Sequence, residues 1–390
     1  MEWINPIVVL ILLFLGWGVW ENVRHRRRLE KIRIRIHVNG TRGKSSVTRL
    51  IAAALREAEI RTFAKTTGSA ARMIFEDGSE LPVLRDRKPN IIEQLKIVKR
   101  AHERGVNALV IECMAIQPQL QRVSEEKIIR STLGVITNAR PDHLEEMGPG
   151  VDDVAHSLAN TLPHGGLAFT AERRMARILR ERADARGTTL IETSDNPVTD
   201  EEMAGFDHVE HEDNVALALA VARHLGVDRA TALRGMHRVR PDLGALKVAA
   251  IDLDGKEMTF VNAFAANDPE STLAIWRRVT RFRPEAANVF LLNTREDRFD
   301  RSEHLVEMIH RHTDYARLLL VGENTQQLLA SCYRKGLQSD KVVRLGAVTA
   351  TEIARALKQI DAEAITLFGI GNVHGGGEEI AHYFTQRSAA

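Results

Sequence analysis

A chain of 390 residues is too long for one small core, and a prior of roughly 150 residues per domain predicts two or three domains. Its 54 basic and 52 acidic residues nearly balance, which excludes a protein that binds nucleic acid through its overall charge. The only two cysteines, Cys113 and Cys332, exclude a disulfide framework and fit a reducing compartment.

The amino terminus contains the segment of most unusual composition. Residues 3–20, WINPIVVLILLFLGWGVW, carry no charge, and about 18 residues is near the lower limit for a membrane-spanning helix. A basic stretch at residues 24–35 follows, so the positive-inside rule predicts a single-pass anchor in the cell membrane with the rest of the chain in the cytosol. A cleaved signal peptide is the competing interpretation, but the apolar run lacks both preceding positive charge and a small-residue cleavage site.

A shortened phosphate-binding loop follows the basic stretch. IRIRIHV at residues 32–38 alternates as a strand does, and SSVTRLIAAALREAEI at residues 45–60 has helical periodicity. Between them, Gly40 and Gly43 allow a tight turn that brings backbone N–H groups to phosphate oxygens. The usual loop has four residues between its first glycine and the Gly-Lys pair, whereas this one has only Thr41 and Arg42.

The residues after Gly43 predict the contacts of a bound nucleotide. Lys44 would reach the β and γ phosphates, and the Ser45 hydroxyl would ligate the magnesium that bridges them. Ser46 offers a second hydroxyl. The alternative is an ordinary turn from a loop into a helix, with Ser45 as its cap.

Short apolar runs alternate with helical segments beyond this point. The runs that predict strands are residues 108–113, 133–138, 166–170 and 189–193. Such alternation favours an α/β fold with a parallel sheet covered on both faces. Glu112 ends the first run, where a carboxylate can hold a metal or simply face water. TNARPDHLEEMG at residues 137–148 follows the second run and supplies His143, whose imidazole can ligate a metal or orient a phosphate.

The alternation breaks near residues 241–244 and then resumes as a second, smaller α/β unit. We therefore expect a transmembrane anchor with a basic segment at residues 1–30, a P-loop parallel-sheet domain at 31–240 and a smaller α/β domain at 241–390.

Several motifs, taken in order, resemble the Mur ligase superfamily. They are the short GTxGKS loop, the strand-end Glu112, TNxxxDHLxxxG from Thr137, EDNVALALAVARHLGV with Asn214, NAFAANDPEST with Asp268, NTREDRFDR and GIGNVHGGGEE. The resemblance covers about residues 32–377. Within the superfamily the chain is most similar to the ATPase subunits of poly-γ-glutamate synthases.

The resemblance implies an ATP-dependent amide ligase that polymerises glutamate through an acyl phosphate, with ATP and Mg²⁺ as cofactors. It implies a nucleotide-binding group made of Gly40, Thr41, Arg42, Gly43, Lys44, Ser45, Ser46, Asn214, Arg295 and Asp297. The implied catalytic group is Lys44, His143, Asp268 and Arg298, and the implied metal group is Ser45, Glu112 and His143. Its implied partners are glutamate, the growing chain and small integral membrane subunits of a synthase and export complex, with a homo-oligomer left open and no nucleic acid.

Two departures separate the chain from the cell-wall ligases of the superfamily. Those enzymes carry a carbamylated, metal-bridging lysine about 15 residues after the DHL histidine, but residues 154–163 here contain no lysine, which puts a second magnesium in doubt. The nucleotide-sugar domain that precedes their ATPase domain is also missing, which argues against a muramyl peptide substrate. A ligase similar to folylpolyglutamate synthase and a membrane-attached nucleotide-binding regulatory subunit without ligase activity remain alternatives.

Overall fold

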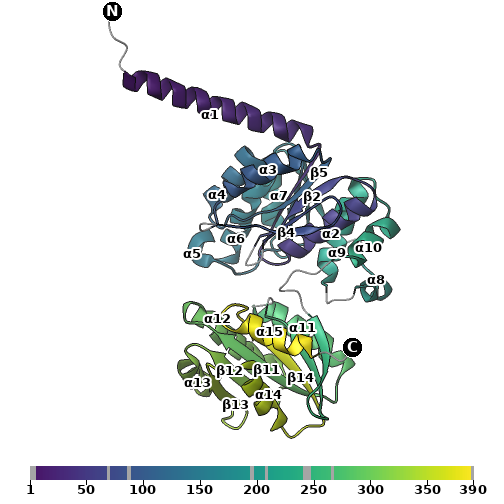
Figure 1. Cartoon of the computed structure of the whole chain (residues 1–390), viewed down its shortest axis with the longest axis vertical. Helices are drawn as coiled ribbons and strands as arrows, with labels where there is room; N and C mark the ends of the chain where they lie inside the picture. Colours follow the sequence, from purple (N-terminus) through teal and green to yellow (C-terminus); the bar gives the residue numbers. More distant parts are fainter. Residues whose placement is uncertain are drawn as a thin grey trace, which may run out of the picture. The chain divides into compact units, whose positions relative to one another are not determined.

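The computed structural model describes residues 6–67, 71–85, 89–193, 197–206, 210–239, 247–264 and 268–387. The chain forms two compact units, Met1–Asp242 and Leu243–Ala390, and each is described by itself (Figure 1). The break between the two predicted domains, at residues 241–244, lies outside the described residues.

The first unit is built on an eight-stranded sheet in the order β4-β3-β2-β5-β1-β6-β7-β8. Its strands are β1 (Ile34–Asn39), β2 (Thr62–Lys65), β3 (Arg72–Ile74), β4 (Glu80–Pro82), β5 (Ala108–Glu112), β6 (Leu133–Ile136), β7 (Leu167–Thr170) and β8 (Thr189–Glu192). The six strands from β2 to β8 in that order are parallel, and β3 and β4 extend one edge in antiparallel fashion. Because β1 lies in the middle, the loop that follows it opens at the centre of the carboxyl edge.

Helices cover both faces of this sheet. They are α2 (Lys44–Glu57), α3 (Glu93–Glu103), α4 (Pro118–Val123), α5 (Leu144–Met147), α6 (Val151–Leu158), α7 (Ala176–Asp184), α8 (Asp200–Ala204), α9 (Glu212–His224) and α10 (Arg229–His237), with a π-helix η1 (Ser124–Ile129) and a 3₁₀ turn η2 (Ala159–Thr161). One core joins α2, α9 and α10 to the strands, and two further clusters lie under α3 and under α6 with α7. Helices on both faces explain why β5 and β6 are buried along their whole length.

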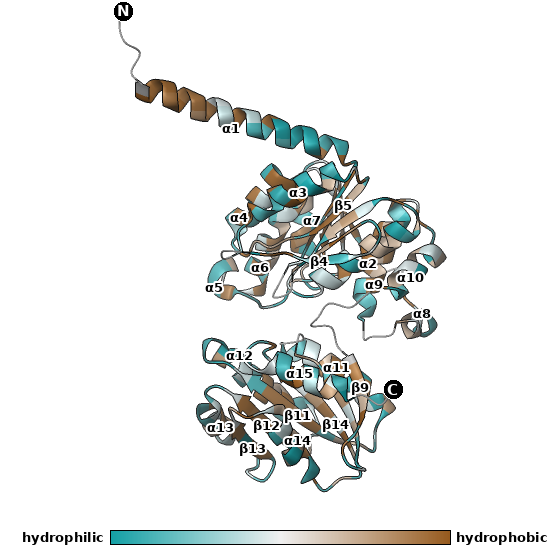
Figure 2. Ribbon diagram, viewed as in Figure 1, coloured by the Kyte–Doolittle hydropathy of each residue, from teal (hydrophilic) through white to brown (hydrophobic). Residues whose placement is uncertain are grey.

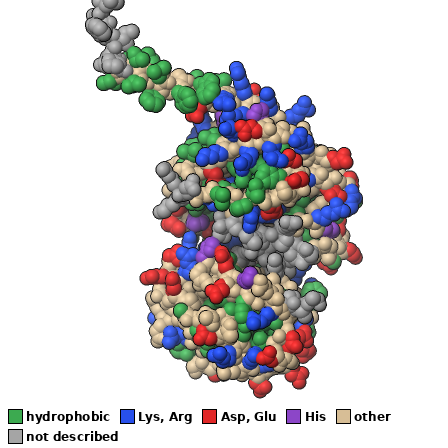
Figure 3. Space-filling view, viewed as in Figure 1, with side chains coloured by type: hydrophobic (Ala, Val, Ile, Leu, Met, Phe, Trp, Pro, Cys, Tyr) green, Lys and Arg blue, Asp and Glu red, His purple; other side chains and the backbone are tan. Residues whose placement is uncertain are grey.

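Helix α1 (Pro6–Lys31) has two parts of opposite character, as Figure 2 shows. Its apolar part is exposed from Ile7 to Trp20, and by length and composition the helix is able to cross a membrane. Its basic part packs on the first unit: His25 is buried with Nε2 2.7 Å from the Ile128 carbonyl, and Leu29 joins the cluster under α3. Figure 3 shows hydrophobic side chains along the free part of α1 and basic side chains where it meets the unit.

The second unit contains a six-stranded sheet in the order β13-β12-β11-β14-β10-β9, with only β9 antiparallel to its neighbour. The strands are β9 (Lys247–Asp252), β10 (Glu257–Asn262), β11 (Ala287–Thr294), β12 (Arg317–Gly322), β13 (Val342–Gly346) and β14 (Ala364–Gly371). The helices are α11 (Pro269–Phe282), α12 (Phe299–His312), α13 (Thr325–Arg334), α14 (Ala350–Lys358) and α15 (Gly377–Gln386), with a 3₁₀ turn η3 (Glu296–Arg298). The predicted α/β class, with a parallel-rich sheet in each unit and an apolar amino-terminal helix, is confirmed.

Candidate functional site

The loop between β1 and α2 has a backbone that only glycine fits at two positions. Gly40 has φ +135°, and a Cβ there would lie 1.9 Å from Thr137 Oγ1. Gly43 has φ +78° and precedes the first turn of α2, and a Cβ there would lie 2.5 Å from Asn214 Oδ1. Both glycines therefore allow neighbouring side chains to approach the loop backbone closely.

The residues after β6 hold the loop in place. Thr41 donates its hydroxyl hydrogen to Asn138 Oδ1 at 2.7 Å, and the Arg42 amide donates to the same oxygen at 3.1 Å. The Thr137 hydroxyl and the Asn138 amide group in turn donate to the Arg42 carbonyl, at 2.6 and 3.0 Å. This set of bonds fixes the loop before any ligand arrives, which lowers the cost of ordering it on binding.

Lys44 and the first amides of α2 make the loop suited to an anion. The Lys44 ammonium donates to the carbonyls of Gly40 at 2.7 Å and Thr41 at 3.3 Å, so it lies over the loop itself. The α2 amino terminus has no side-chain cap and no acidic residue in its first turn. A helix terminus with unsatisfied N–H groups and a nearby ammonium favours phosphate.

Ser45 and Glu112 meet at the carboxyl edge of the sheet. The Ser45 hydroxyl donates to Glu112 Oε2 at 2.7 Å, and Glu112 is only 3% exposed. Thr67, just after β2, donates its amide to the same oxygen at 2.7 Å and its hydroxyl to Glu112 Oε1. Sequence reasoning missed Thr67, although its place after a strand end on the same edge was a usable signal.

Ser46 points to a different carboxylate. Its hydroxyl donates to Glu210 Oε2 at 2.9 Å, and Asn214 Nδ2 on α9 donates to Glu210 Oε1 at 2.9 Å. Glu210 is 3% exposed. The predicted nucleotide residue Asn214 therefore does lie beside the loop. Glu210 was missed, because nothing in the sequence marks a glutamate between two segments as a partner of a serine 164 positions away.

The segment after Asn138 contributes a charged pair and a histidine. Asp142 Oδ2 lies 3.0 Å from Arg42 Nη1, which ties the segment to the loop. His143 has φ +46°, unusual for a residue other than glycine, and precedes α5. Its ring is partly exposed, and within the described residues its ion-pair partner is Glu145 at 3.7 Å. Of the three predicted metal ligands, Ser45 and Glu112 are therefore in direct contact. His143 lies in the separate segment that contains Asp142.

The predicted residues of the second unit gather at the carboxyl edge of its own sheet. Asp268 caps α11 by accepting a hydrogen bond from the Ser271 amide at 2.9 Å. After β11, Arg295 Nη2 lies 3.0 Å from Asp297 Oδ2, and Arg298 Nε lies 4.0 Å from the same oxygen. Asn293 Nδ2 donates to the carbonyls of Asn372 at 2.8 Å and His374 at 3.2 Å, tying the loop after β11 to the loop after β14.

The donors at Ser45 and Glu112 suit a hard divalent cation. Magnesium prefers oxygen ligands, keeps several waters and is commonly bound by one or two protein groups together with substrate phosphates. A hydroxyl and a carboxylate at the amino terminus of α2 meet that requirement. Across the described ranges no cluster of three or more His, Cys, Asp and Glu residues forms a complete protein cage for a metal. The site therefore fits a metal that arrives with a phosphate ligand.

Two family models match the chain, and together they cover most of it. The Mur ligase middle domain matches residues 38–249, and the poly-gamma-glutamate synthase CapB C-terminal domain matches residues 248–387. Capsule biosynthesis protein CapB of Bacillus anthracis is 37% identical over 383 residues, which span 97% of this chain and 82% of that protein. PGA synthase CapB of Bacillus subtilis (strain 168) is 35% identical over 381 residues, which span 97% of this chain and 96% of that protein.

Solved structures of low sequence identity share the fold. A folylpolyglutamate synthase of Mycobacterium tuberculosis, in a study of complexes with ADP and AMPPCP, has a TM-score of 0.69 and 13% identity, covering 95% of this chain and 100% of that one. A folylpolyglutamate synthase of Thermotoga maritima has a TM-score of 0.63 and 11% identity, covering 97% of each chain. At these identities the likeness shows the fold alone.

Proposed function

The chain belongs to the CapB family of poly-γ-glutamate synthases within the Mur ligase superfamily, and from this premise we propose how its residues make the product. It is an ATP-dependent ligase that joins glutamate into a polymer. The observation that carries the proposal is the shortened loop at the centre of the sheet, with Lys44 over its carbonyls and Ser45 on Glu112.

The proposed reaction activates a carboxylate with ATP. The γ-carboxylate of a terminal glutamate attacks the γ-phosphorus of ATP, which forms an acyl phosphate and releases ADP. The amine of the incoming glutamate then attacks the acyl carbon and expels phosphate, so that one amide bond forms for each ATP consumed. A carboxylate is a poor electrophile, and phosphorylation supplies the leaving group that it lacks.

In this proposal the loop residues stabilise the transferring phosphoryl group. Lys44 would turn from the loop carbonyls toward the β and γ phosphates, and the first amides of α2, whose amino terminus has no side-chain cap, would face the same phosphates. Ser45 and Glu112 would hold a magnesium ion, which would neutralise phosphate charge when bound. His143 would take a further metal or phosphate position, while Ser46 and Asn214 would lie on the nucleoside side of the loop.

The second unit would supply the remaining groups of the proposal. Asp268 and Arg298 would act on the substrate, and Arg295 and Asp297 would contact the nucleotide. The Arg295–Asp297 pair is available for this, since Arg295 is about one-third exposed and Asp297 more than half exposed. Arg298→Ala should lower kcat at saturating ATP, and an unchanged kcat would remove Arg298 from the proposal.

We also propose that α1 anchors the enzyme in the cell membrane with both units in the cytosol. Its exposed apolar part and the basic residues after it support this orientation. A polymer that leaves the cell is best made beside an export partner, and small integral membrane subunits are the proposed partners.

Glutamate-dependent ADP release from the full chain in membranes tests the function. The normal chain should release ADP only when glutamate is present and should yield a γ-linked product. Lys44→Ala should abolish turnover, whereas Lys99→Ala on α3, whose side chain is half exposed, should not change it. Full activity in the Lys44→Ala variant would contradict the assignment of this loop as the site that binds the ATP phosphates. ADP release indifferent to glutamate would favour the regulatory alternative, and activity on a soluble folate instead of glutamate chains would favour the folylpolyglutamate alternative.

A further inference from the structure

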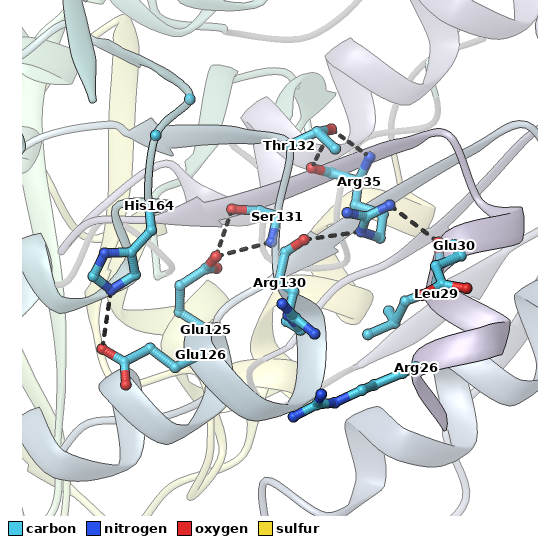
Figure 4. A pocket seen from close by; sticks show the side chains of 12 residues that line it. Arg26, Leu29, Glu30, Arg35, Glu125, Glu126, Arg130, Ser131, Thr132 and His164 are labelled. Atoms are coloured by element: carbon cyan, nitrogen blue, oxygen red, sulfur yellow. Dashed lines mark hydrogen bonds and ion pairs between the residues drawn. The ribbon is translucent and has the colours of Figure 1, made fainter. Parts of the chain in front are cut away.

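A pocket opens at the edge of the first sheet opposite to the phosphate loop. It has a volume of about 630 Å³ and lies between the end of α1, the end of η1 and the starts of β1, β6 and β7. Figure 4 shows its wall, to which α1 contributes Arg26, Leu29 and Glu30, and the turn after η1 contributes Arg130 and Ser131.

Two guanidinium groups of this pocket are unpaired. Within the described residues, neither Arg26 nor Arg130 has a hydrogen-bond or ion-pair partner for its side chain, and both are exposed. In Figure 4 they extend from opposing elements toward the same space. Arg130 has φ +47°, a backbone conformation costly for arginine, which directs its side chain out of the η1 helical path. Two cations that converge without an acid between them favour an anionic ligand.

The acidic groups of the pocket are mostly engaged elsewhere. Glu125 accepts hydrogen bonds from Ser131 and contacts His37 at 2.8 Å behind the wall. Glu126 contacts Arg122, His164 and Arg186. The Arg35 guanidinium is also engaged, since it donates to the carbonyls of Leu29, Ile32 and Arg130. Glu30 is the remaining acidic side chain of the lining, and its single carboxylate does not balance the two guanidinium groups of Arg26 and Arg130.

If α1 crosses the membrane, Arg26 lies just outside the layer of lipid headgroups, close enough for a long side chain to reach a phosphate. The apolar run ends at Trp20, and Arg26 is six residues farther along the helix, or about 9 Å at 1.5 Å per residue. The polar layer on each side of a bilayer is roughly 5–8 Å thick. Trp20 has the Arg24 guanidinium over its ring at 5.0 Å, an arrangement that suits this boundary.

We propose that this pocket binds the phosphate of an anionic phospholipid headgroup, with Arg26 and Arg130 as its two ligands. The inference rests on the membrane anchoring proposed above. The polyanionic product is the other candidate, but the pocket is compact, borders the membrane helix and lies at the amino ends of β1, β6 and β7, whereas the phosphate loop follows the carboxyl end of β1. Lipid is therefore the favoured occupant.

The test uses native mass spectrometry of the full chain, purified in detergent, with phosphatidylglycerol or phosphatidylcholine added. The normal chain should retain phosphatidylglycerol preferentially. Arg26→Ala with Arg130→Ala should weaken that binding about tenfold or more, as expected for the loss of two basic groups near a phosphate. The control, Arg33→Ala with Lys127→Ala, removes the same charge from two exposed residues outside the pocket and should bind as the normal chain does.

Four results would overturn the proposal: equal retention of the two lipids, equal loss in both double variants, displacement of lipid by an equal concentration of soluble glycerol phosphate, or tighter binding of poly-γ-glutamate than of lipid. Thermal unfolding of both double variants must match the normal chain, which separates lost binding from lost folding. A failure of the anchoring proposal gives a different result from a failure of the lipid proposal. If the chain is not anchored, the normal chain stays in solution without detergent.

Discussion

At the scale of single residues, two adjacent serines at the start of α2 contact different carboxylates. Ser45 bonds Glu112 and Ser46 bonds Glu210, at 2.7 and 2.9 Å. The two hydroxyls are chemically identical and one position apart, so substituting each in turn compares the two sides of the loop with little change in the helix.

Ser45→Ala is expected to lower kcat/KM for ATP by about a hundredfold or more, since it removes a proposed ligand of magnesium. Ser46→Ala should lower kcat/KM for ATP by about tenfold or less. ADP release measured across a magnesium series checks this, and only the Ser45 variant should need more magnesium for half-maximal rate. Equal losses with an unchanged magnesium requirement in both variants would contradict the assignment.

Alanine substitutions at Gly43 and Gly187 distinguish the effect of backbone strain from the effect of steric crowding. Both have positive φ, +78° and +65°, but a Cβ on Gly43 would meet Asn214, while a Cβ on Gly187 would have nothing within 4 Å. Gly187→Ala should lower the free energy of unfolding by about 1 kcal/mol and keep activity. Gly43→Ala should cost more stability and abolish nucleotide binding, as measured by urea unfolding and by titration with ATP. Comparable stability losses would show that crowding by Asn214 is unimportant.

The sequence predicted the positions of the residues whose place in the fold follows from local spacing, while their roles stay predictions. Gly40, Gly43, Lys44 and Ser45 are recognisable from a glycine pattern between a strand and a helix, and Glu112 from the end of an apolar run. Glu210 was not predictable, because its contacts with the loop depend on how α9 packs on α2. That packing is a tertiary property without a local pattern.

At the scale of elements, the π-helix η1 is fixed to the sheet by a buried ion pair. His37 of β1 is 0% exposed, and its Nδ1 lies 2.8 Å from Glu125 Oε2. Burial lowers the pKa of His37, but Cys113 and the Glu125 carboxylate outweigh it and raise this pKa to about 9. The histidine is therefore charged at neutral pH in the folded chain.

This raised pKa predicts a pH-dependent stability. The pair stabilises the fold fully below the unfolded pKa of His37, about 6.5, and its contribution is lost as the pH rises from there through about 9. The loss is on the order of 3 kcal/mol. Urea unfolding of the normal chain and Glu125→Gln at pH 6.5 and 9 checks it, and the stability difference between the two should shrink at the higher pH. If the stability difference between the normal chain and the variant is the same at both pH values, the His37–Glu125 pair is not the source of the pH dependence.

Among the elements, predictions succeeded where apolar runs were long. The runs at residues 108–113, 133–138, 166–170 and 189–193 became β5, β6, β7 and β8 within one or two residues. The antiparallel edge of β3 and β4 was missed, because strands of three residues are too short for any alternation to be visible. The π-helix was missed because its geometry depends on buried polar contacts rather than on periodicity.

At the scale of the whole molecule, α1 combines the proposed membrane anchor with a structural support for the rest of the first unit. Its residues from Ile7 to Trp20 are exposed, whereas Leu29 is 3% exposed and Ile32, just after the helix, is 1% exposed. The sequence predicted the anchor from composition, but it did not predict that the same helix closes a hydrophobic cluster, since the cluster is completed by residues of α3 and β5.

Two truncations separate these roles. Removing residues 1–22 should release the chain from the membrane fraction and leave its stability nearly unchanged. Removing residues 1–32 should cost a further 2–5 kcal/mol or so, because the burial of Leu29 and Ile32 is lost. Cell fractionation and urea unfolding check the two effects. Equal free energies of unfolding for the two truncated chains would show that the end of α1 does not stabilise the first unit.

The parallel arrangement around β1 has a consequence for the polymer itself. The end of α1 leads into the start of β1, and the phosphate loop leaves its other end, six residues or about 20 Å away. In an enzyme anchored as proposed, bond formation would then take place at the carboxyl edge of the sheet, which is the edge remote from the lipid. A newly started chain is too short to occupy the loop and touch the bilayer at once, so under the proposed anchoring we expect transfer to an export partner to require a minimum polymer length set by the length of β1.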